Sequence, residues 1–443
     1  MNPTCVAVAA LLPLLAAVSA VAAMPKGETA DVPSVRYVVK AGDTLIGLAT
    51  RALVRPGDWQ AVAKANRISD PRRLPVGKAL AIPLPLLRRE PQDATIAAFS
   101  GQVAVDPGGA ARLGLTVGAG TTVSTGANSF VTLALVDGSR VTLPSQSKVR
   151  IASLDTIVID GRLERRFELV TGRGDFGVTP RERPEDRFLV KTPVAVAAVR
   201  GTEFRVAHDA ATGKSVVGVV EGEVAGRALV ARGETAIAAG TGAVLASEGV
   251  RMAKLLPPPV LLRPGKVQDD PAVVFDIAPG SMGVKRHVQL ARDAGFVDLF
   301  AETETQGAAA QFDNIGNGTM YVRLTDIDAD GVEGLPTVVE VERFLSGLEA
   351  TAGAVPGKGP RRTQFRWQPT GGGTRVYDFV LARDEALLDR VVDAPGLTGT
   401  AMTVSGLAPG VWYWRVTVTA RDGVKRRIKV FPVRSLTIAR RET

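Results

Sequence analysis

The stretch "FVTLALVDGSRVTL", Phe130 to Leu143, gives the clearest indication of the fold. Its apolar residues alternate with polar or small ones on both sides of Asp137-Gly138, which is the period of a half-buried strand. Asp-Gly at the centre of such a pattern is typical of a tight hairpin turn. The alternating positions are Val131, Leu133 and Leu135 before the turn, and Val141 and Leu143 after it.

The same pattern recurs along the surrounding chain, in "RRFELVTGRGDFGV", "RFLVKTPVAVAAVRGTEFRV" and "SVVGVVEGEVAG". Glycine (47) and proline (28) are frequent and aromatic residues make up only 5%, which favours many short strands joined by turns. We therefore predict an all-β domain over residues 97–250. Gly201 fits a bulge or turn between strands. The string Gly172 to Asp175, "GRGD", is more typical of a turn than of an adhesion ligand.

The last third of the chain contains an internal repeat. Leu290-Ala291-Arg292-Asp293 recurs as Leu381-Ala382-Arg383-Asp384 at an offset of 91 residues, and Tyr321 recurs as Tyr413 at an offset of 92. Two units with strands, turns and a Tyr-x-Arg segment each suggest two β-sandwiches. We place these repeats at residues 258–345 and 350–440.

The N-terminal segment carries no charge from Cys5 to Ala23 and ends in small residues. This pattern predicts a secretory signal peptide over residues 1–23. The alternative is an uncleaved membrane anchor, because the apolar run nearly reaches spanning length. After cleavage we expect no stable membrane span. Cys5 is the only cysteine, so the mature chain would have no disulfide and no thiol chemistry.

A compact unit follows over residues 35–84. "YVVKAGDTLIGLA", Tyr37 to Ala49, begins as an alternating strand and continues with helical spacing. Either Asp43 or Thr44 occupies the expected N-cap, and Asp58 can cap a second helix. A short alternating run before Pro83 closes the unit, so the predicted order is strand, helix, helix, strand.

This unit resembles the LysM domain, a small carbohydrate-binding module. The resemblance implies binding of N-acetylglucosamine-containing glycans, here peptidoglycan, in a shallow groove between two loops. On this chain the loops are Gly42–Leu45 and Asn66–Asp70. The residues that carry the likeness are Tyr37, Val39, Lys40, Gly42, Asp43, Thr44, Leu45, Asn66, Ile68, Leu74, Gly77, Leu80, Ile82 and Pro83.

The chemistry of these loops suits an N-acetyl group. Exposed backbone N–H and C=O groups can pair with its amide, and glycine allows close approach. Leu45 or Ile68 can pack on the methyl group. The alternative is that Asp43 and Thr44 only cap a helix and Ile68 only fills the core, and both roles can coexist. The candidate glycan-binding residues are Gly42, Asp43, Thr44, Leu45, Asn66, Arg67, Ile68, Ser69 and Asp70.

The all-β domain resembles the FecR domain through "VDGSRVTL", "LVTGRGDFGV" and "VVGVVEGEV", and above all through Thr192-Pro193 and Arg200 to Phe204. The best-known members are periplasmic parts of membrane-spanning regulators that relay iron-siderophore status to a sigma factor. This chain shows no internal membrane helix and no anti-sigma segment, so we expect a periplasmic interaction module. The two repeats resemble fibronectin type III or similar immunoglobulin-like modules, most clearly at Leu407 to Gly410.

Catalytic and metal-binding patterns are mostly missing. "DIDADG", Asp326 to Gly331, begins like a calcium loop, but Thr337 stands where the bidentate glutamate belongs, so we expect a hairpin turn. The two histidines, His208 and His287, fall in different predicted domains and cannot form a typical zinc site or a triad together. A carboxylate-only glycosidase stays open, since its pair is set in space rather than in sequence.

The sequence thus predicts a mainly β, multidomain, non-catalytic protein of the periplasm that needs no cofactor and no metal. Its expected partners are peptidoglycan and an unidentified envelope protein. The net charge is +9 with basic residues scattered, which predicts no nucleic-acid binding and leaves open a weak attraction to an acidic polymer. The alternative function is a FecR-type periplasmic sensor or regulator of envelope or iron-linked signalling.

Overall fold

The computed structural model describes residues 33–180, 186–230, 233–280, 283–356 and 361–440. The predicted signal peptide at 1–23 lies outside the described residues. The chain divides into two compact units, one ending at Arg88 and the other beginning at Arg89. Strands make up 56% of the chain and helices 5%, so the predicted mainly β architecture is confirmed. Within the described residues, no helix is long and apolar enough to cross a lipid bilayer.

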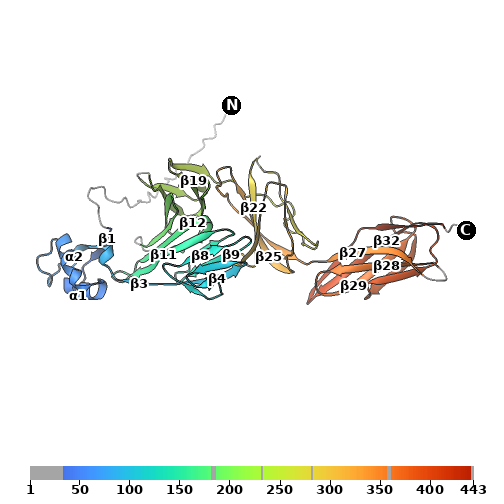
Figure 1. Cartoon of the computed structure of the whole chain (residues 1–443), viewed down its shortest axis with the longest axis horizontal. Helices are drawn as coiled ribbons and strands as arrows, with labels where there is room; N and C mark the ends of the chain where they lie inside the picture. Colours follow the sequence, from blue (N-terminus) through green and yellow to red (C-terminus); the bar gives the residue numbers. More distant parts are fainter. Residues whose placement is uncertain (1–32, 181–185, 231–232, 281–282, 357–360, 441–443) are drawn as a thin grey trace, which may run out of the picture. The chain divides into compact units, whose positions relative to one another are not determined.

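The first unit, blue in Figure 1, has the predicted order of strand, helix, helix, strand. Its two strands pair antiparallel, with Tyr37 opposite Leu80. A final 3-10 turn packs back onto the unit, because the N–H of Val54 donates to the carbonyl of Leu86. The elements are β1 (Ser34–Val38), α1 (Leu45–Ala52), η1 (Pro56–Asp58), α2 (Trp59–Ala65), β2 (Ala79–Pro83) and η2 (Leu84–Leu86).

The helix starts show which side chains cap them. Thr44 is the N-cap of α1, and its hydroxyl accepts a hydrogen bond from the N–H of Gly47 at 3.0 Å. Asp58 makes no side-chain capping bond to α2 and instead pairs with Arg55, since the 3-10 turn η1 leads directly into the helix. The predicted capping role of Asp58 is therefore wrong.

The strands from β3 to β20 build the second domain, and their pairing closes on itself. One continuous apolar core fills it. The strands are β3 (Arg89–Pro91), β4 (Ala94–Ser100), β5 (Val103–Asp106), β6 (Gly109–Ala110), β7 (Thr116–Val117), β8 (Thr122–Thr125), β9 (Phe130–Leu135), β10 (Arg140–Leu143), β11 (Lys148–Ile157), β12 (Leu163–Gly177), β13 (Arg187–Lys191), β14 (Ala195–Val199), β15 (Glu203–Asp209), β16 (Lys214–Glu221), β17 (Glu223–Ala228), β18 (Thr235–Ala238), β19 (Thr241–Ala246) and β20 (Gly249–Lys254).

The long strand β12 joins the two sheets of this domain. Its first half pairs with β11 and β13, and its second half pairs with β10 and β15. The change of sheet occurs at Gly172, where φ is +82° and an added Cβ would lie 2.5 Å from the carbonyl oxygen of Gln146. Only glycine fits this bend, because both the backbone angle and the close approach exclude a side chain.

Two local predictions in this domain have opposite outcomes. The hairpin of β9 and β10 turns at Gly138, as predicted, and the N–H of Leu135 donates to the carbonyl of Ser139. The string from Gly172 to Asp175 was expected to be a turn, but it lies inside β12. The bend at Gly172 lets the same strand pair in one sheet before the glycine and in the other sheet after it, so the chain does not reverse direction there.

Two sandwiches follow, yellow to red in Figure 1. In each, two sheets pack over one apolar core. The first contains β21 (Val273–Asp276), β22 (Lys285–Ala291), β23 (Leu299–Thr305), β24 (Ala309–Phe312), β25 (Gly318–Ile327) and β26 (Thr337–Arg343); the second contains β27 (Gly347–Val355), β28 (Arg362–Thr370), β29 (Thr374–Ala382), β30 (Arg390–Leu397), β31 (Ala401–Ser405), β32 (Gly410–Asp422), β33 (Lys425–Val430) and β34 (Arg434–Ile438).

The sequence repeat occupies equivalent places in the two sandwiches. Ala291 ends β22 opposite Tyr321, and Ala382 ends β29 opposite Tyr413. The aspartate two residues further on accepts backbone N–H bonds from the following loop in both repeats. A carboxylate that satisfies several loop N–H groups fixes the turn, which explains why this tetrapeptide recurs.

Candidate functional site

The two loops predicted to form a groove meet in the structure. The N–H of Leu45 donates to the carbonyl of Pro71 at 2.9 Å, which joins the start of α1 to the segment after α2. Gly42 is exposed with φ of +85°, and no heavy atom lies within 4 Å of the position a Cβ would take. The loop at Gly42 thus presents bare backbone to solvent beside the second loop.

Asp43 holds the first loop in shape. Its carboxylate accepts hydrogen bonds from the hydroxyl of Tyr37 at 2.7 Å and from the N–H of Lys40 at 2.8 Å, and it pairs with Arg51 at 2.9 Å. Burial raises the pKa of Asp43, but these hydrogen bonds and the Arg51 charge outweigh burial and hold the pKa below its usual value. Asp43 is therefore ionised at neutral pH, with its oxygens engaged inside the loop.

Asn66 holds the second loop in the same way. Its side-chain amide donates to the carbonyls of Val62 and Ala81, and its oxygen accepts from the N–H of Ala81 at 2.7 Å. These bonds tie the end of α2 to the middle of β2. Leu45 is only 1% exposed, so its side chain is core and cannot pack on a ligand. The predicted contact between Leu45 and an N-acetyl methyl group is wrong for this reason.

The remaining candidates offer surface to a ligand. Arg67, Ser69 and Asp70 are exposed, and Ile68 is half-buried. Among the nine candidate residues, four backbone N–H groups have no hydrogen-bond partner within the described residues. They belong to Gly42, Thr44, Ser69 and Asp70. Free N–H groups on both loops can donate hydrogen bonds to the carbonyl oxygen of an N-acetyl group.

The histidine in the all-β domain does not form a nucleophilic pair. The Nδ1 of His208 lies 3.0 Å from the hydroxyl oxygen of Ser215, but that hydroxyl donates to Thr192 at 2.7 Å. Nδ1 must therefore be the donor to Ser215, which leaves it unable to accept the serine proton. Ser215 is fully buried, so no substrate could reach it.

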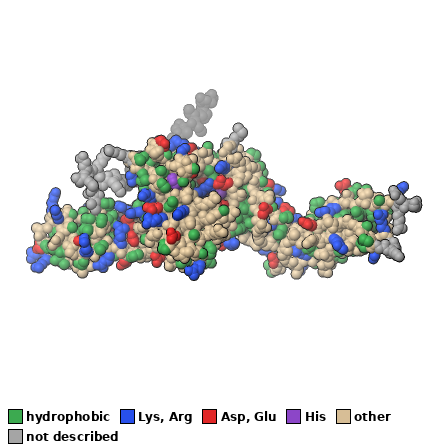
Figure 2. All heavy atoms as spheres, viewed as in Figure 1, with side chains coloured by type: hydrophobic (Ala, Val, Ile, Leu, Met, Phe, Trp, Pro, Cys, Tyr) green, Lys and Arg blue, Asp and Glu red, His purple; other side chains and the backbone are tan. Residues whose placement is uncertain are grey.

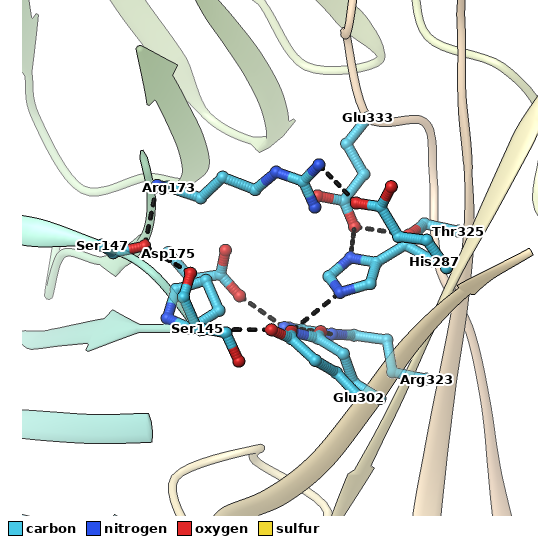
Figure 3. A network of polar contacts seen from close by, with 12 residues as sticks. Ser145, Ser147, Arg173, Asp175, His287, Glu302, Arg323, Thr325 and Glu333 are labelled. Atoms are coloured by element: carbon cyan, nitrogen blue, oxygen red, sulfur yellow. Dashed lines mark hydrogen bonds and ion pairs between the residues drawn. The ribbon is translucent and has the colours of Figure 1, made fainter. Parts of the chain in front are cut away.

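A second polar centre lies between the all-β domain and the first sandwich (Figure 3). His287 on β22 is 2% exposed and lies between two carboxylates. Its Nε2 is 2.9 Å from Glu302, and its Nδ1 is 3.1 Å from Glu333. Ser145 of the all-β domain donates its backbone N–H to Glu302 at 3.1 Å. Glu302, which is paired with the buried imidazole, thus links the sheet of the sandwich to the neighbouring domain.

The charges of this cluster stabilise one another. Burial lowers the pKa of His287, but Glu333 and Glu302 outweigh it and raise the pKa to about 9. Burial likewise raises the pKa of Glu302, yet the bond from His287 lowers it to about 2. The nearby charges of Arg205 and His287 lower the pKa of Glu333 against the effect of burial. The imidazolium and both carboxylates are therefore charged at neutral pH.

The Arg-Gly-Asp string belongs to the same interface. Arg173 pairs with Glu304 of β23, and Asp175 pairs with Arg323 of β25. Arg323 also lies over the ring of Phe296, 4.7 Å from its centroid. Both charged side chains of the string are committed to the first sandwich, so they do not form an exposed adhesion loop.

Sequence reasoning missed this cluster because its charged residues lie far apart in the sequence. A signal existed in "LFAETET", where Glu302 and Glu304 stand at alternate positions of one strand. "MYVRLT" places Arg323 similarly inside an apolar strand. Charges inside otherwise apolar strands indicate pairing partners elsewhere in the fold, since an unpaired buried charge is costly.

The incomplete calcium loop is a turn, as predicted. The carboxylate of Asp328 accepts the N–H groups of Asp330 and Val332 at 2.9 Å, and Asp330 pairs with Arg251 at 2.6 Å. Asp326 lies 3.8 Å from Arg286. The acidic side chains thus serve the turn and neighbouring arginines. No cluster of metal-ligating side chains is found among the described residues.

Comparison with protein families identifies two domains. Residues 37–83 match the LysM domain, and residues 121–225 match the FecR protein family. The chain therefore contains a LysM domain, which holds the two loops described above, and a FecR domain, which makes up most of the all-β domain. A search of curated proteins found no match.

Solved structures give weaker likenesses. A putative anti-sigma factor from Parabacteroides distasonis is 19% identical with a TM-score of 0.25, over 30% of this chain and 59% of that one. The FN1–FN3 domains of chicken CNTN1 are 8% identical with a TM-score of 0.20, and the match covers 54% of this chain and 98% of that one. The fibronectin(III)-like modules of Clostridium thermocellum CbhA are 11% identical with a TM-score of 0.18, and the match covers 41% of this chain and 94% of that one.

Proposed function

We propose that this protein is a non-catalytic component of the cell envelope that binds peptidoglycan through its LysM domain and presents its FecR and sandwich domains to a protein partner. The observation that carries the proposal is the pair of joined loops with free backbone amides at Gly42, Thr44, Ser69 and Asp70, in a domain of a glycan-binding class. The N-acetyl groups of a glycan strand would lie along these amides, with Ile68 against a methyl group.

The rest of the chain supports a presenting role. The FecR domain and the first sandwich share the buried ionic cluster around His287, together with an apolar contact that includes Phe130 and Phe296. Ion pairs across the interface, such as those of Asp175 with Arg323 and of Arg205 with Glu333, hold the two domains together. The cations of β33 pair with Glu342, Asp269 and Asp270 of the first sandwich. The FecR domain and the two sandwiches would then present the outer faces of their sheets to a protein partner.

Sedimentation with insoluble peptidoglycan tests the proposal. The full chain should sediment with the polymer, and a variant that lacks residues 33–88 should stay in solution. The deletion ends at Arg88 because residues 84–88 pack on the LysM domain through Val54 and Ala52. Equal sedimentation of both proteins would place the binding elsewhere, and no sedimentation of either would refute peptidoglycan binding.

Gly42→Val provides a finer test of the groove itself. A β-branched residue at φ of +85° distorts the first loop and places a side chain over its free amides. Gly57→Val is the matched control, because Gly57 is also exposed, has open space at its Cβ position and lies outside the two loops. We expect binding to be lost in Gly42→Val and kept in Gly57→Val.

The FecR match over residues 121–225 favours one second candidate, a periplasmic sensor that transmits a signal from an outer component. This function requires the N-terminal apolar segment to remain as a membrane anchor. N-terminal sequencing of the protein from membrane and soluble fractions separates the two: an intact Met1 in the membrane fraction supports the sensor, and a start after residue 23 removes it.

A further inference from the structure

The positive charge of the chain is concentrated in the LysM domain. Residues 33–88 contain ten Lys and Arg side chains against three Asp, a net charge of +7, whereas the whole chain has a net charge of +9. Lys and Arg side chains stand out on the visible face of this domain in Figure 2. A domain of this size with such an excess attracts anions and repels cations over a Debye length.

Internal pairing neutralises few of these cations. Asp43 pairs with Arg51, and Asp58 pairs with Arg55. The third carboxylate, Asp70, accepts the backbone N–H of Arg72 instead of an ion pair. The cations close to the second loop therefore form no ion pair within the described residues. These are Lys64, Arg67, Arg72 and Arg73, and all four are exposed.

These four residues, here called the cationic rim, border the candidate groove. Lys64 lies in the last turn of α2, and Arg67 follows within the second loop. Arg72 and Arg73 follow Pro71, whose carbonyl binds the N–H of Leu45 in the first loop. Backbone hydrogen bonds thus hold the rim residues next to the two loops.

Arg67 occupies a backbone position that normally belongs to glycine. Helix α2 ends in a Schellman motif, in which the N–H of Ile68 donates to the carbonyl of Ala63 and the N–H of Arg67 donates to that of Lys64. Arg67 stands at the left-handed position with φ of +52°, where glycine or asparagine is favoured. No other non-glycine residue of this domain has a positive φ among the described residues. A strained arginine at a surface loop points to a role other than folding.

We propose that the cationic rim recognises carboxylates carried by the same glycan that fills the groove. This inference rests on the proposed function. The ligand class is an N-acetylated glycan with anionic branches, such as peptidoglycan with free carboxylates on its peptide branches, in preference to a neutral N-acetylglucosamine oligomer. The amides of the groove bind the sugar, and the rim binds the charge beside it.

The test compares insoluble peptidoglycan before and after its carboxylates are converted to neutral amides with a carbodiimide. The full chain should bind the amidated polymer about tenfold more weakly at 50 mM salt. The difference should nearly vanish at 0.5 M salt, where the screening length falls to about 4 Å.

A second sample, from which phosphodiester-linked polymers have been removed chemically, should bind the full chain as tightly as untreated peptidoglycan does. Weaker binding to this sample would assign the rim to phosphates and overturn the carboxylate proposal.

Point variants separate the rim from general charge. Arg72→Gln should weaken binding to untreated peptidoglycan about threefold at low salt. Arg36→Gln removes one exposed cation from β1, outside the rim, and should change binding by less than half that factor. An equal loss in both variants would mean unspecific attraction and would overturn the proposal.

Arg67→Gly gives two readouts of opposite sign. Glycine relieves the left-handed position, so hydrogen exchange of α2 in the full chain should slow or stay unchanged, while binding to untreated peptidoglycan weakens about threefold. Faster exchange with unchanged binding would make Arg67 a structural residue only. Failure of the wild-type chain to bind any peptidoglycan sample would refute the proposed function, whereas equal binding to all samples would refute the rim alone.

Discussion

The buried imidazole of His287 makes a sharp prediction about pH. The chain has only two histidines, so the ¹⁵N-imidazole NMR spectrum is simple and His287→Gln identifies the resonance. We expect this imidazole to titrate near pH 9, because Glu333 and Glu302 raise its pKa against the effect of burial. In the unfolded chain the same group titrates near 6.5.

The difference between the two pKa values fixes the size of the effect on stability. Because the folded pKa is raised, the contribution is fully present below pH 6.5 and is lost as pH rises through about 9. A shift of about 2.5 units corresponds to ~3 kcal/mol, of which about 2 kcal/mol is lost between pH 7.5 and 9.5. Glu302 has the opposite sign: its pKa is lowered to about 2, so its contribution is present above pH 4.5 and lost as pH falls through 2.

His287→Gln should remove the dependence at high pH and lower stability overall. The variant leaves Glu302 and Glu333 buried without the cation between them, which costs about 3–5 kcal/mol near neutral pH. Replacing Glu302 with Gln in the same chain should restore part of this loss. Hydrogen exchange of peptides from β22 and β23 is the suitable assay, since the tryptophans lie outside the interface. They are Trp59, Trp367, Trp412 and Trp414.

Two results would contradict this reasoning. One is a His287 resonance that titrates near pH 6.5 in the folded protein. The other is a decrease in protection of β22 between pH 7.5 and 9.5 that is the same in the wild type and in His287→Gln. Either result would mean that the imidazole does not lie between two charged carboxylates.

Further predictions concern single residues. Asn66→Ala should destabilise the LysM domain by about 2 kcal/mol, because the N–H and C=O of Ala81 lose their partner; thermal unfolding measures this, and an unchanged midpoint would contradict it. Gly172→Ala should destabilise the FecR domain by at least ~2 kcal/mol, since its Cβ would meet Gln146; denaturant unfolding decides, and a neutral effect would contradict the bend. Calcium at millimolar concentration should leave the melting temperature unchanged, because Asp330 is paired with Arg251.

The LysM domain was predictable because the residues that determine its strands, helices and loops are close together in the sequence. The strand pattern before Gly42, the cap at Thr44 and the loop at Asn66 lie within about fifty residues, and each has a short-range physical cause. The sequence left the roles of Asp43 and Thr44 open, and the structure resolves them: Thr44 caps the helix, and Asp43 braces the loop.

The interface cluster was not predictable because its partners are distant in sequence. Asp175 and Arg323 are 148 residues apart, and His287 and Glu333 are 46 apart. Periodicity assigns a residue to a face of a strand, but it does not show which other domain covers that face. The Arg-Gly-Asp string illustrates the limit, because only the position of Glu304 shows that Arg173 is occupied.

The charge of the chain has two different physical roles that a single net value hides. In the FecR domain and the first sandwich, arginines such as Arg323 lie inside strands and pair with half-buried carboxylates, so they add little to the surface potential. In the LysM domain, cations such as Arg72 are exposed and unpaired within the described residues. Salt screens exposed charges strongly and buried pairs weakly. Raising the salt concentration should therefore weaken the proposed binding to an anionic glycan, while the ion pairs around His287 should persist.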